Sequence, residues 1–129
     1  MAALLESDAM ALDAMRGEGR PLTSALTFAE GFRSIVRARV SGRIDAQQAR
    51  DATSLLESLE RRCASIPVTD AVLSRSGRPF PVEPVRTLDA IHLASLEVIG
   101  VRAAHVVVAT CDERVRVNAR ALGYRVEPA

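Results

Sequence analysis

In much of the N-terminal half of the chain an apolar residue recurs every three or four positions, as on one face of an α-helix. This spacing predicts helices over residues 2–16 and 26–40. A third helix is expected to begin after Asp45, because Asp45 and Gln48 fit a capping box. The buried faces of the second and third helices are predicted to consist of these apolar residues: Ala29, Phe32 and Val36 in the second, and Ala49, Ala52, Leu56 and Leu59 in the third.

Short apolar or alternating runs separate the helical segments and have a length typical of strands. We predict four strands, at residues 21–24, 64–68, 105–109 and 124–127. The third is apolar throughout, which is typical of a strand covered on both faces. Helices that alternate with short strands indicate an α/β sandwich with a mainly parallel sheet. The length of 129 residues is that of a single domain, residues 1–129.

The C-terminal half contains the most apolar helix and the most clearly predicted loop. Residues 74–84 include three prolines and a glycine and are therefore expected to form a loop. Residues 87–99 predict a helix that is apolar on most sides and so lies at the centre of the fold. Another helical repeat includes Val115 and is expected to end at Gly123.

Composition narrows the classes of protein only slightly. All 17 basic residues are Arg, but a formal net charge of +1 is no signature of nucleic-acid binding. The planar guanidinium suits phosphate, so this preference is consistent with RNA contact, but a GC-rich genome is the favoured explanation. Only a cluster of Arg side chains would decide for RNA. Cys63 and Cys111 are too few for a disulfide framework and are expected to be reduced. No apolar run has the length of a membrane span and no signal peptide is recognisable, so we expect a cytoplasmic protein.

Three acidic residues lie near the starts of predicted helices that follow strands. Glu30 lies in the first turns of one helix, Asp89 opens another, and Asp112 directly follows a buried strand. If the strand ends converge, the three carboxylates share one crevice. Two carboxylates about 4 Å apart repel by about 4 kcal/mol at an effective dielectric constant near 20. Such a group needs shared protons, basic partners or a cation, and oxygen ligands favour Mg²⁺ or Mn²⁺.

Each acid taken alone also fits a structural role. Thr27 with Glu30, and Thr110 with Glu113, match the capping-box pattern. Asp89 would stabilise the positive end of a helix dipole. Spacing alone therefore favours helix capping over metal binding.

The order of these residues resembles the PIN-domain family, in particular the VapC-type ribonuclease toxins of bacterial toxin–antitoxin pairs. The most specific match is Thr87-Leu88-Asp89-Ala90-Ile91-His92-Leu93-Ala94. Ser24 with Glu30 before it, and Thr110 with Asp112 after it, extend the match over nearly the whole chain. The resemblance implies a PIN-like three-layer α/β/α sandwich, and it reverses the preference for capping.

Site residues follow from the resemblance. It implies that Glu30, Asp89 and Asp112 are catalytic and together bind Mg²⁺ or Mn²⁺. Ser24 and Thr110 would be supporting hydroxyls beside the site.

Other polar residues lie next to these acids. Arg33 and Arg37 lie on the face of the helix that carries Glu30, and either contact RNA phosphates or pair with that carboxylate. His92 lies one turn after Asp89, where a hydrogen-bonded helix histidine is a better interpretation than a general base. Glu113 is interpreted as a capping residue.

The resemblance also implies a function. A metal-activated water would attack an RNA phosphodiester, so the protein would be a metal-dependent endoribonuclease with a small VapB-like antitoxin partner, commonly as a homodimer. The family opens with a central strand that carries Asp-x-Ser, and this sequence has no such segment. Its loss would leave two sheet halves with unpaired edges, so we expect the native protein to begin several residues upstream. The alternative is a truncated, catalytically impaired PIN-like protein that acts as a binding module for an antitoxin.

Overall fold

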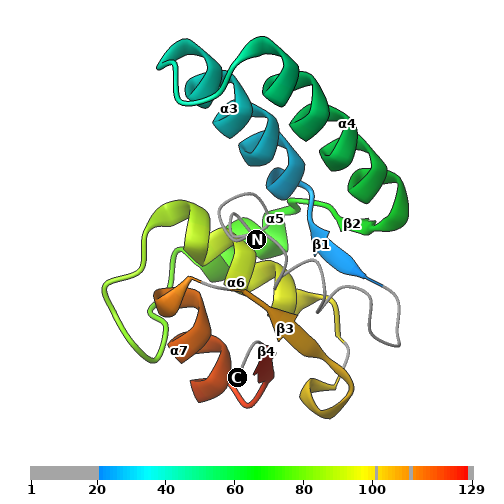
Figure 1. Ribbon diagram of the computed structural model, residues 1–129. Helices are drawn as coiled ribbons and strands as arrows, with labels where there is room; N and C mark the ends of the chain where they lie inside the picture. The colour runs from blue at the N-terminus through cyan, green and yellow to red at the C-terminus, as the bar shows by residue number, and fades with distance from the viewer. Residues whose placement is uncertain (1–20, 101, 111, 128–129) are drawn as a thin grey trace.

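The computed structural model describes residues 21–100, 102–110 and 112–127 of the chain (Figure 1). Its helices are α3 (Leu26–Val40), α4 (Ala46–Arg62), α5 (Asp70–Ser76), α6 (Thr87–Val98) and α7 (Glu113–Ala121). Its strands are β1 (Leu22–Ser24), β2 (Ala64–Ile66), β3 (Val107–Ala109) and β4 (Arg125–Glu127), and Ala103–His105 form a 3₁₀ turn. The predicted helix over residues 2–16 lies outside the described residues, as does Cys111.

The strands form two parallel pairs. β1 pairs with β2, with Leu22 opposite Ala64, and β3 pairs with β4, with Val107 opposite Arg125. Parallel pairing is therefore confirmed. Within the described ranges, however, the pairs are separate two-stranded sheets, so the single sheet of a three-layer sandwich is not formed by these residues.

Helices α3 and α4 pack side by side at one end of the molecule (Figure 1). Asp45 caps α4, with its side chain accepting from the Gln48 N–H at 2.8 Å while Gln48 Oε1 accepts from the Asp45 N–H at 2.9 Å, so the predicted capping box is confirmed. The buried face of α4 is also largely as predicted, because Leu56 and Leu59 lie in the core.

The predicted buried face of α3 is only partly correct. Phe32 packs against the core as expected, but Ala29 and Val36 are exposed, and Phe28 and Ile35 form the buried contact with α4. The helix carries apolar residues on more than one side, and the sequence pattern did not show which side meets α4.

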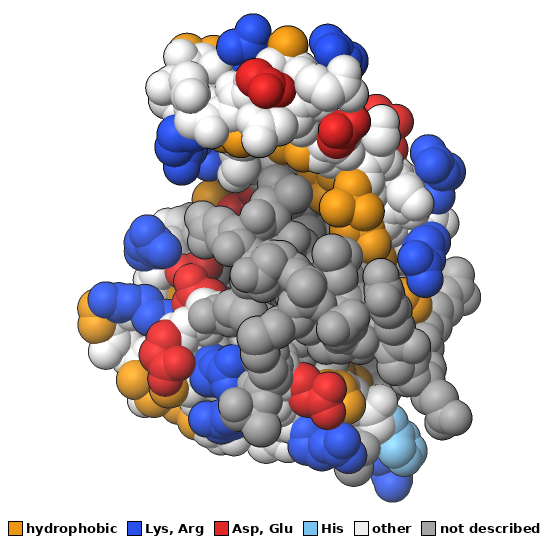
Figure 2. Space-filling model, in the orientation of Figure 1, with side chains coloured by type: hydrophobic (Ala, Val, Ile, Leu, Met, Phe, Trp, Pro, Cys, Tyr) orange, Lys and Arg blue, Asp and Glu red, His pale blue; other side chains and the backbone are white. Residues whose placement is uncertain are grey.

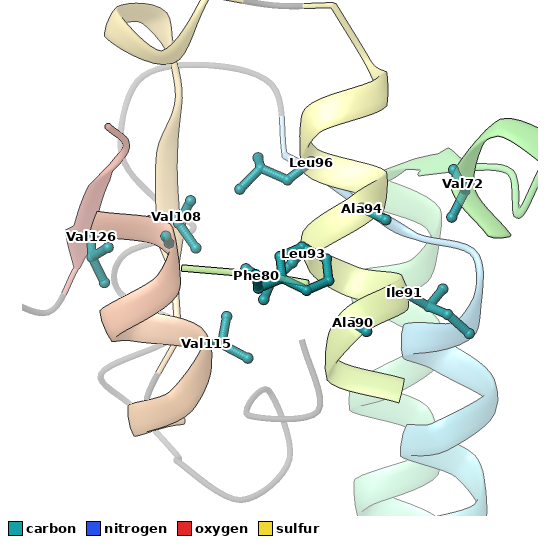
Figure 3. Close-up of a cluster of buried hydrophobic side chains, with 11 residues drawn as sticks. Val72, Phe80, Ala90, Ile91, Leu93, Ala94, Leu96, Val108, Val115 and Val126 are labelled. Carbon is teal, nitrogen blue, oxygen red and sulfur yellow. The ribbon is translucent and has the colours of Figure 1, made fainter. Parts of the chain in front are cut away.

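The larger core surrounds α6, as predicted for so apolar a helix. All residues from Asp89 to Leu96 are buried. Figure 3 shows Leu93 beside the ring of Phe80, with Val108 and Val115 facing them from β3 and α7. Because α6 is packed on most sides, its buried polar side chains, Asp89 and His92 among them, are held in place together with its apolar ones.

The segment before α6 differs from the predicted loop over residues 74–84. Its first residues belong to α5, a helix that was not predicted from the sequence. Thr69 is nevertheless a recognisable N-cap, and its side chain accepts from the Val72 N–H at 3.3 Å. The remaining loop is fixed by the buried Asn118 of α7, which accepts from the Val82 N–H and donates to the Val82 carbonyl, both at 2.9 Å.

The predicted strand over residues 105–109 also begins later than expected. His105 ends the 3₁₀ turn, and pairing starts only at Val107. The end of α7 is close to the prediction, with Gly123 at φ 95° directly after its last turn. None of the helices in the described ranges is both long and apolar enough to cross a membrane.

Candidate metal centre

Asp89 occupies the first turn of α6 and is 6% exposed. Its nearest cationic group is the guanidinium of Arg86, which precedes the helix, at 3.6 Å between Nε and Oδ2. This distance is beyond hydrogen-bond length, and the Arg86 side chain is 79% exposed, so the pair is weak. The Oδ2 atom is buried and has no hydrogen-bond partner. No role was predicted for Arg86 from the sequence, although its position three residues before Asp89, directly before the helix, was a signal.

The surroundings of Asp89 disfavour its charged form. Burial raises the pKa of this carboxyl, and the negative charge of Asp112 raises it further, whereas Arg86 and His92 lower it less. A buried carboxylate with a second carboxylate nearby is the setting in which a proton or a metal ion is taken up. The position is therefore electrostatically suited to a cation.

Asp112 is the N-cap of α7. Its Oδ1 accepts hydrogen bonds from the N–H groups of Arg114 at 2.9 Å and Val115 at 3.1 Å. The predicted capping box led by Thr110 is thus wrong, because Thr110 lies two residues before the N-cap and is fully buried. Its hydroxyl accepts from the Asp112 N–H at 3.1 Å. Glu113 does not cap either, being an exposed residue of the first turn. Capping uses one carboxylate oxygen of Asp112 and leaves the other free of hydrogen bonds from the described residues.

Glu30 lies in the second turn of α3 and is hydrogen-bonded across the molecule to His92 of α6. The capping box predicted for Thr27 is wrong, because Thr27 lies inside α3 and its hydroxyl bonds to that of Thr23 at 2.7 Å. The start of α3 is stabilised instead by Ser24, whose Oγ accepts from the Leu26 N–H at 3.3 Å. Ser24 is buried, so its role at the strand end is structural support.

The two Arg residues that follow Glu30 do not pair with it in the described part of the chain. Arg33 is exposed, and Arg37 donates to Ser34 Oγ at 3.0 Å. Figure 2 shows Arg side chains spread around the edge of the visible face, with Asp and Glu side chains among them. No single basic cluster therefore marks an RNA-binding surface on the described part of that face.

Comparison with known proteins gives the chain its family. It is 36% identical over 124 residues to Ribonuclease VapC35 of Mycobacterium tuberculosis, in strains CDC 1551 and H37Rv, which covers 95% of this chain and 83% of the relative. The chain belongs to the VapC family. No protein-family model matches it, and no solved structure matches it either.

In this VapC-family chain two of the three predicted acids come together, and the third is linked to them through His92. Asp89 lies within electrostatic reach of Asp112 and of His92, and His92 in turn binds Glu30. Within residues 21–100, 102–110 and 112–127, no three His, Cys, Asp or Glu side chains form a group that could hold a metal ion by themselves. The structure thus connects the three acids without assembling them into one cluster.

The two free carboxylate oxygens nevertheless fit a hard divalent cation. Mg²⁺ commonly keeps several waters and is held through only one or two carboxylates. Asp89 Oδ2 is buried without a partner, and one oxygen of Asp112 is not used in capping. Glu30 could add a third carboxylate from α3. The donor set is entirely oxygen, which suits Mg²⁺ or Mn²⁺.

Proposed function

We propose that this protein is a VapC-type toxin ribonuclease that hydrolyses RNA phosphodiesters with Mg²⁺ or Mn²⁺. The observation that carries the proposal is the buried, unpartnered Oδ2 of Asp89 beside a second carboxylate, that of Asp112. In the proposed site Asp89, Asp112 and Glu30 are both the metal ligands and the catalytic residues. A bound ion would polarise the phosphate and lower the pKa of a coordinated water.

The chain itself would supply orientation. Packing of α6 fixes Asp89, and the two hydrogen bonds at the start of α7 fix Asp112. The buried hydroxyls of Ser24 and Thr110 hold the backbone where their strands end. Sites built on such fixed elements keep reacting groups in place without reorganisation.

Substrate and partner remain proposals. Arg33 and Arg37 are free of Glu30 and exposed, which leaves their guanidinium groups available for RNA phosphates. A VapB-like antitoxin, a homodimer and a cytoplasmic location are proposed from family membership. A purely binding role is not favoured, because the relative in Mycobacterium tuberculosis is a ribonuclease by name.

The deciding experiment compares RNA cleavage by the purified chain with that of Asp89→Asn, in Mn²⁺ and in EDTA. We expect cleavage to require the metal and to fall at least about a hundredfold in the variant. Losing a residue that only supports a metal ligand already costs up to about a hundredfold, and Asp89 is proposed as a ligand itself. Asp70→Asn is the matched control, since Asp70 is an exposed acid in the first turn of α5. Cleavage that survives Asp89→Asn would refute the assignment.

A further inference from the structure

His92 is a buried polar residue for which the proposed function has no role so far. It lies in the middle of α6, is 4% exposed, and its Nε2 contacts Oε1 of Glu30, a residue 62 positions earlier on α3. The Glu30 side chain is 20% exposed. Among the described residues no other side chain hydrogen-bonds to the Glu30 carboxylate, so within this part of the chain His92 is the group that holds that carboxylate.

The chemistry of the contact fixes the protonation of the ring. A carboxylate oxygen only accepts, so His92 Nε2 carries the hydrogen and donates it to Glu30. Burial lowers the pKa of His92, although the bond to Glu30 and the charge of Asp89 oppose that effect. In a neutral ring with hydrogen on Nε2, the Nδ1 atom is an acceptor, and here it is buried without a partner.

A second buried acceptor lies one helical turn away. Asp89 is three residues before His92, so the two side chains emerge on the same side of α6. Asp89 Oδ2 and His92 Nδ1 are the buried side-chain atoms of the described chain that have no hydrogen-bond partner. The two atoms suit a hydrated cation in different ways. Asp89 Oδ2 can bind the ion directly, and His92 Nδ1 can accept a hydrogen bond from a water molecule on the ion.

We propose that His92 is a positioning residue of the metal site: by donating from Nε2 to Glu30 Oε1, it holds the Glu30 carboxylate against α6, the helix that carries Asp89, and leaves Oε2 for the ion. The inference rests on the proposed function and assigns a role to a residue outside the acid set. Carboxylates that bind metals are themselves held by hydrogen bonds from outer residues, whose loss weakens metal binding. Because its ring is buried and Nε2 is engaged, His92 acts through Glu30 and does not touch substrate.

Two substitutions separate this role from packing. In His92→Gln the amide nitrogen takes the position of Nε2 and can still donate to Glu30. In His92→Asn the amide nitrogen corresponds to Nδ1 and does not reach it. We expect Mn²⁺ affinity, measured by titration calorimetry on the full chain, to fall about tenfold in His92→Asn and to stay within about threefold in His92→Gln. Equal weakening in both variants, or in neither, would overturn the proposal.

A double-mutant cycle adds a readout that loss of packing would not change. If His92 acts through Glu30, adding His92→Asn to Glu30→Gln should change Mn²⁺ affinity by less than about twofold. Additive losses would overturn the proposal.

Nitrogen NMR of the wild-type ring needs no variant, and so decides the question if His92→Asn fails to fold. Hydrogen on Nε2 supports the proposal and hydrogen on Nδ1 overturns it. The proposed metal site and the proposed role of His92 can be refuted separately. A wild type that binds no Mn²⁺ refutes both. A wild type that binds Mn²⁺ but is insensitive to His92→Asn refutes only the role of His92.

Discussion

Replacing Asp89 by Asn should stabilise the metal-free protein while abolishing its response to metal. The substitution keeps the shape of the side chain and removes its charge. In the structure that charge is 94% withdrawn from solvent, since the residue is 6% exposed, and one of its oxygens has no partner. An amide at this position has no charge to desolvate and does not repel Asp112.

The magnitude follows from three opposing contributions. A buried polar group without a partner costs about 1–3 kcal/mol, and more when it is charged; because Asn keeps a buried amide here, the substitution removes only the additional cost of the charge, on the order of 2 kcal/mol. Against this, the exposed guanidinium of Arg86 recovers at most about 1 kcal/mol, and the positive end of α6 about 0.3–1 kcal/mol. The net gain in unfolding free energy for Asp89→Asn is therefore about 1 kcal/mol, which raises the melting temperature of a domain of this size by about 4 °C.

Thermal unfolding in EDTA and in Mn²⁺ tests the reasoning. In EDTA the variant should melt above the wild type. With Mn²⁺ at about ten times its dissociation constant, the wild type gains about 1.4 kcal/mol of stability and the variant gains none. The wild type should then melt at the same temperature as the variant or above it. Asp70→Asn, which changes an exposed acid at the same kind of helix position, should leave the response to Mn²⁺ intact. A variant clearly less stable than the wild type in EDTA would mean that Asp89 is a structural helix-capping acid, and the reasoning would fail.

Three further predictions concern the same region. The stability advantage of Asp89→Asn should narrow as pH falls, because the raised pKa of Asp89 means that its costly charged form is lost in acid; denaturant unfolding against pH would show it, and a constant difference would contradict it. Asp112→Asn should keep the cap on α7 but weaken Mn²⁺ binding, whereas Asp112→Ala should also lose about 1 kcal/mol of stability; equal stability of the two variants would rule out the cap. Asn118→Ala removes three hydrogen bonds, two of them to Val82, and should lower the unfolding free energy by about 2–4 kcal/mol; a loss below about 1 kcal/mol would show that the loop is fixed by other contacts.

Much of the secondary structure could be predicted because its signals are local. Residues 26–40 were expected to be helical and match α3, and the cap at Asp45 placed the start of α4. Helix α5 was missed because it has only seven residues, too few for a helical period to repeat. The buried face of α3 was predicted correctly only at Phe32, because the face depends on contact with α4, which the pattern within one helix does not contain.

Sheet architecture was predictable only in part. The short strands were found and their parallel pairing was expected, but their partners depend on segments far apart in sequence: β1 pairs with β2 across α3 and α4. Strand ends were overestimated, as with Pro67 and Val68 beyond β2, because apolar character continues after pairing stops. The full layering of the fold stays a prediction.

The site shows the same division between local and distant information. The starts of α6 and α7 could be predicted from sequence, and with them the positions of Asp89 and Asp112. The contact between Glu30 and His92 could not, because no spacing rule relates residues 62 apart. His92 was expected to be a hydrogen-bonded helix histidine, which is confirmed, but its partner required the three-dimensional arrangement.

The two unpartnered acceptors on α6 connect stability with function. Buried polar atoms in folded proteins are almost always hydrogen-bonded, and those of Asp89 and His92 break that rule one turn apart. They lie on the most deeply packed helix of the described chain, where the surrounding core can offset their cost. Truncating a buried apolar side chain of this helix, such as the fully buried Leu93, should therefore lower the unfolding free energy. Removing the charge of Asp89 should instead raise it. A residue whose neutralisation strengthens the protein serves binding rather than folding, and we propose that Asp89 serves to bind a cation.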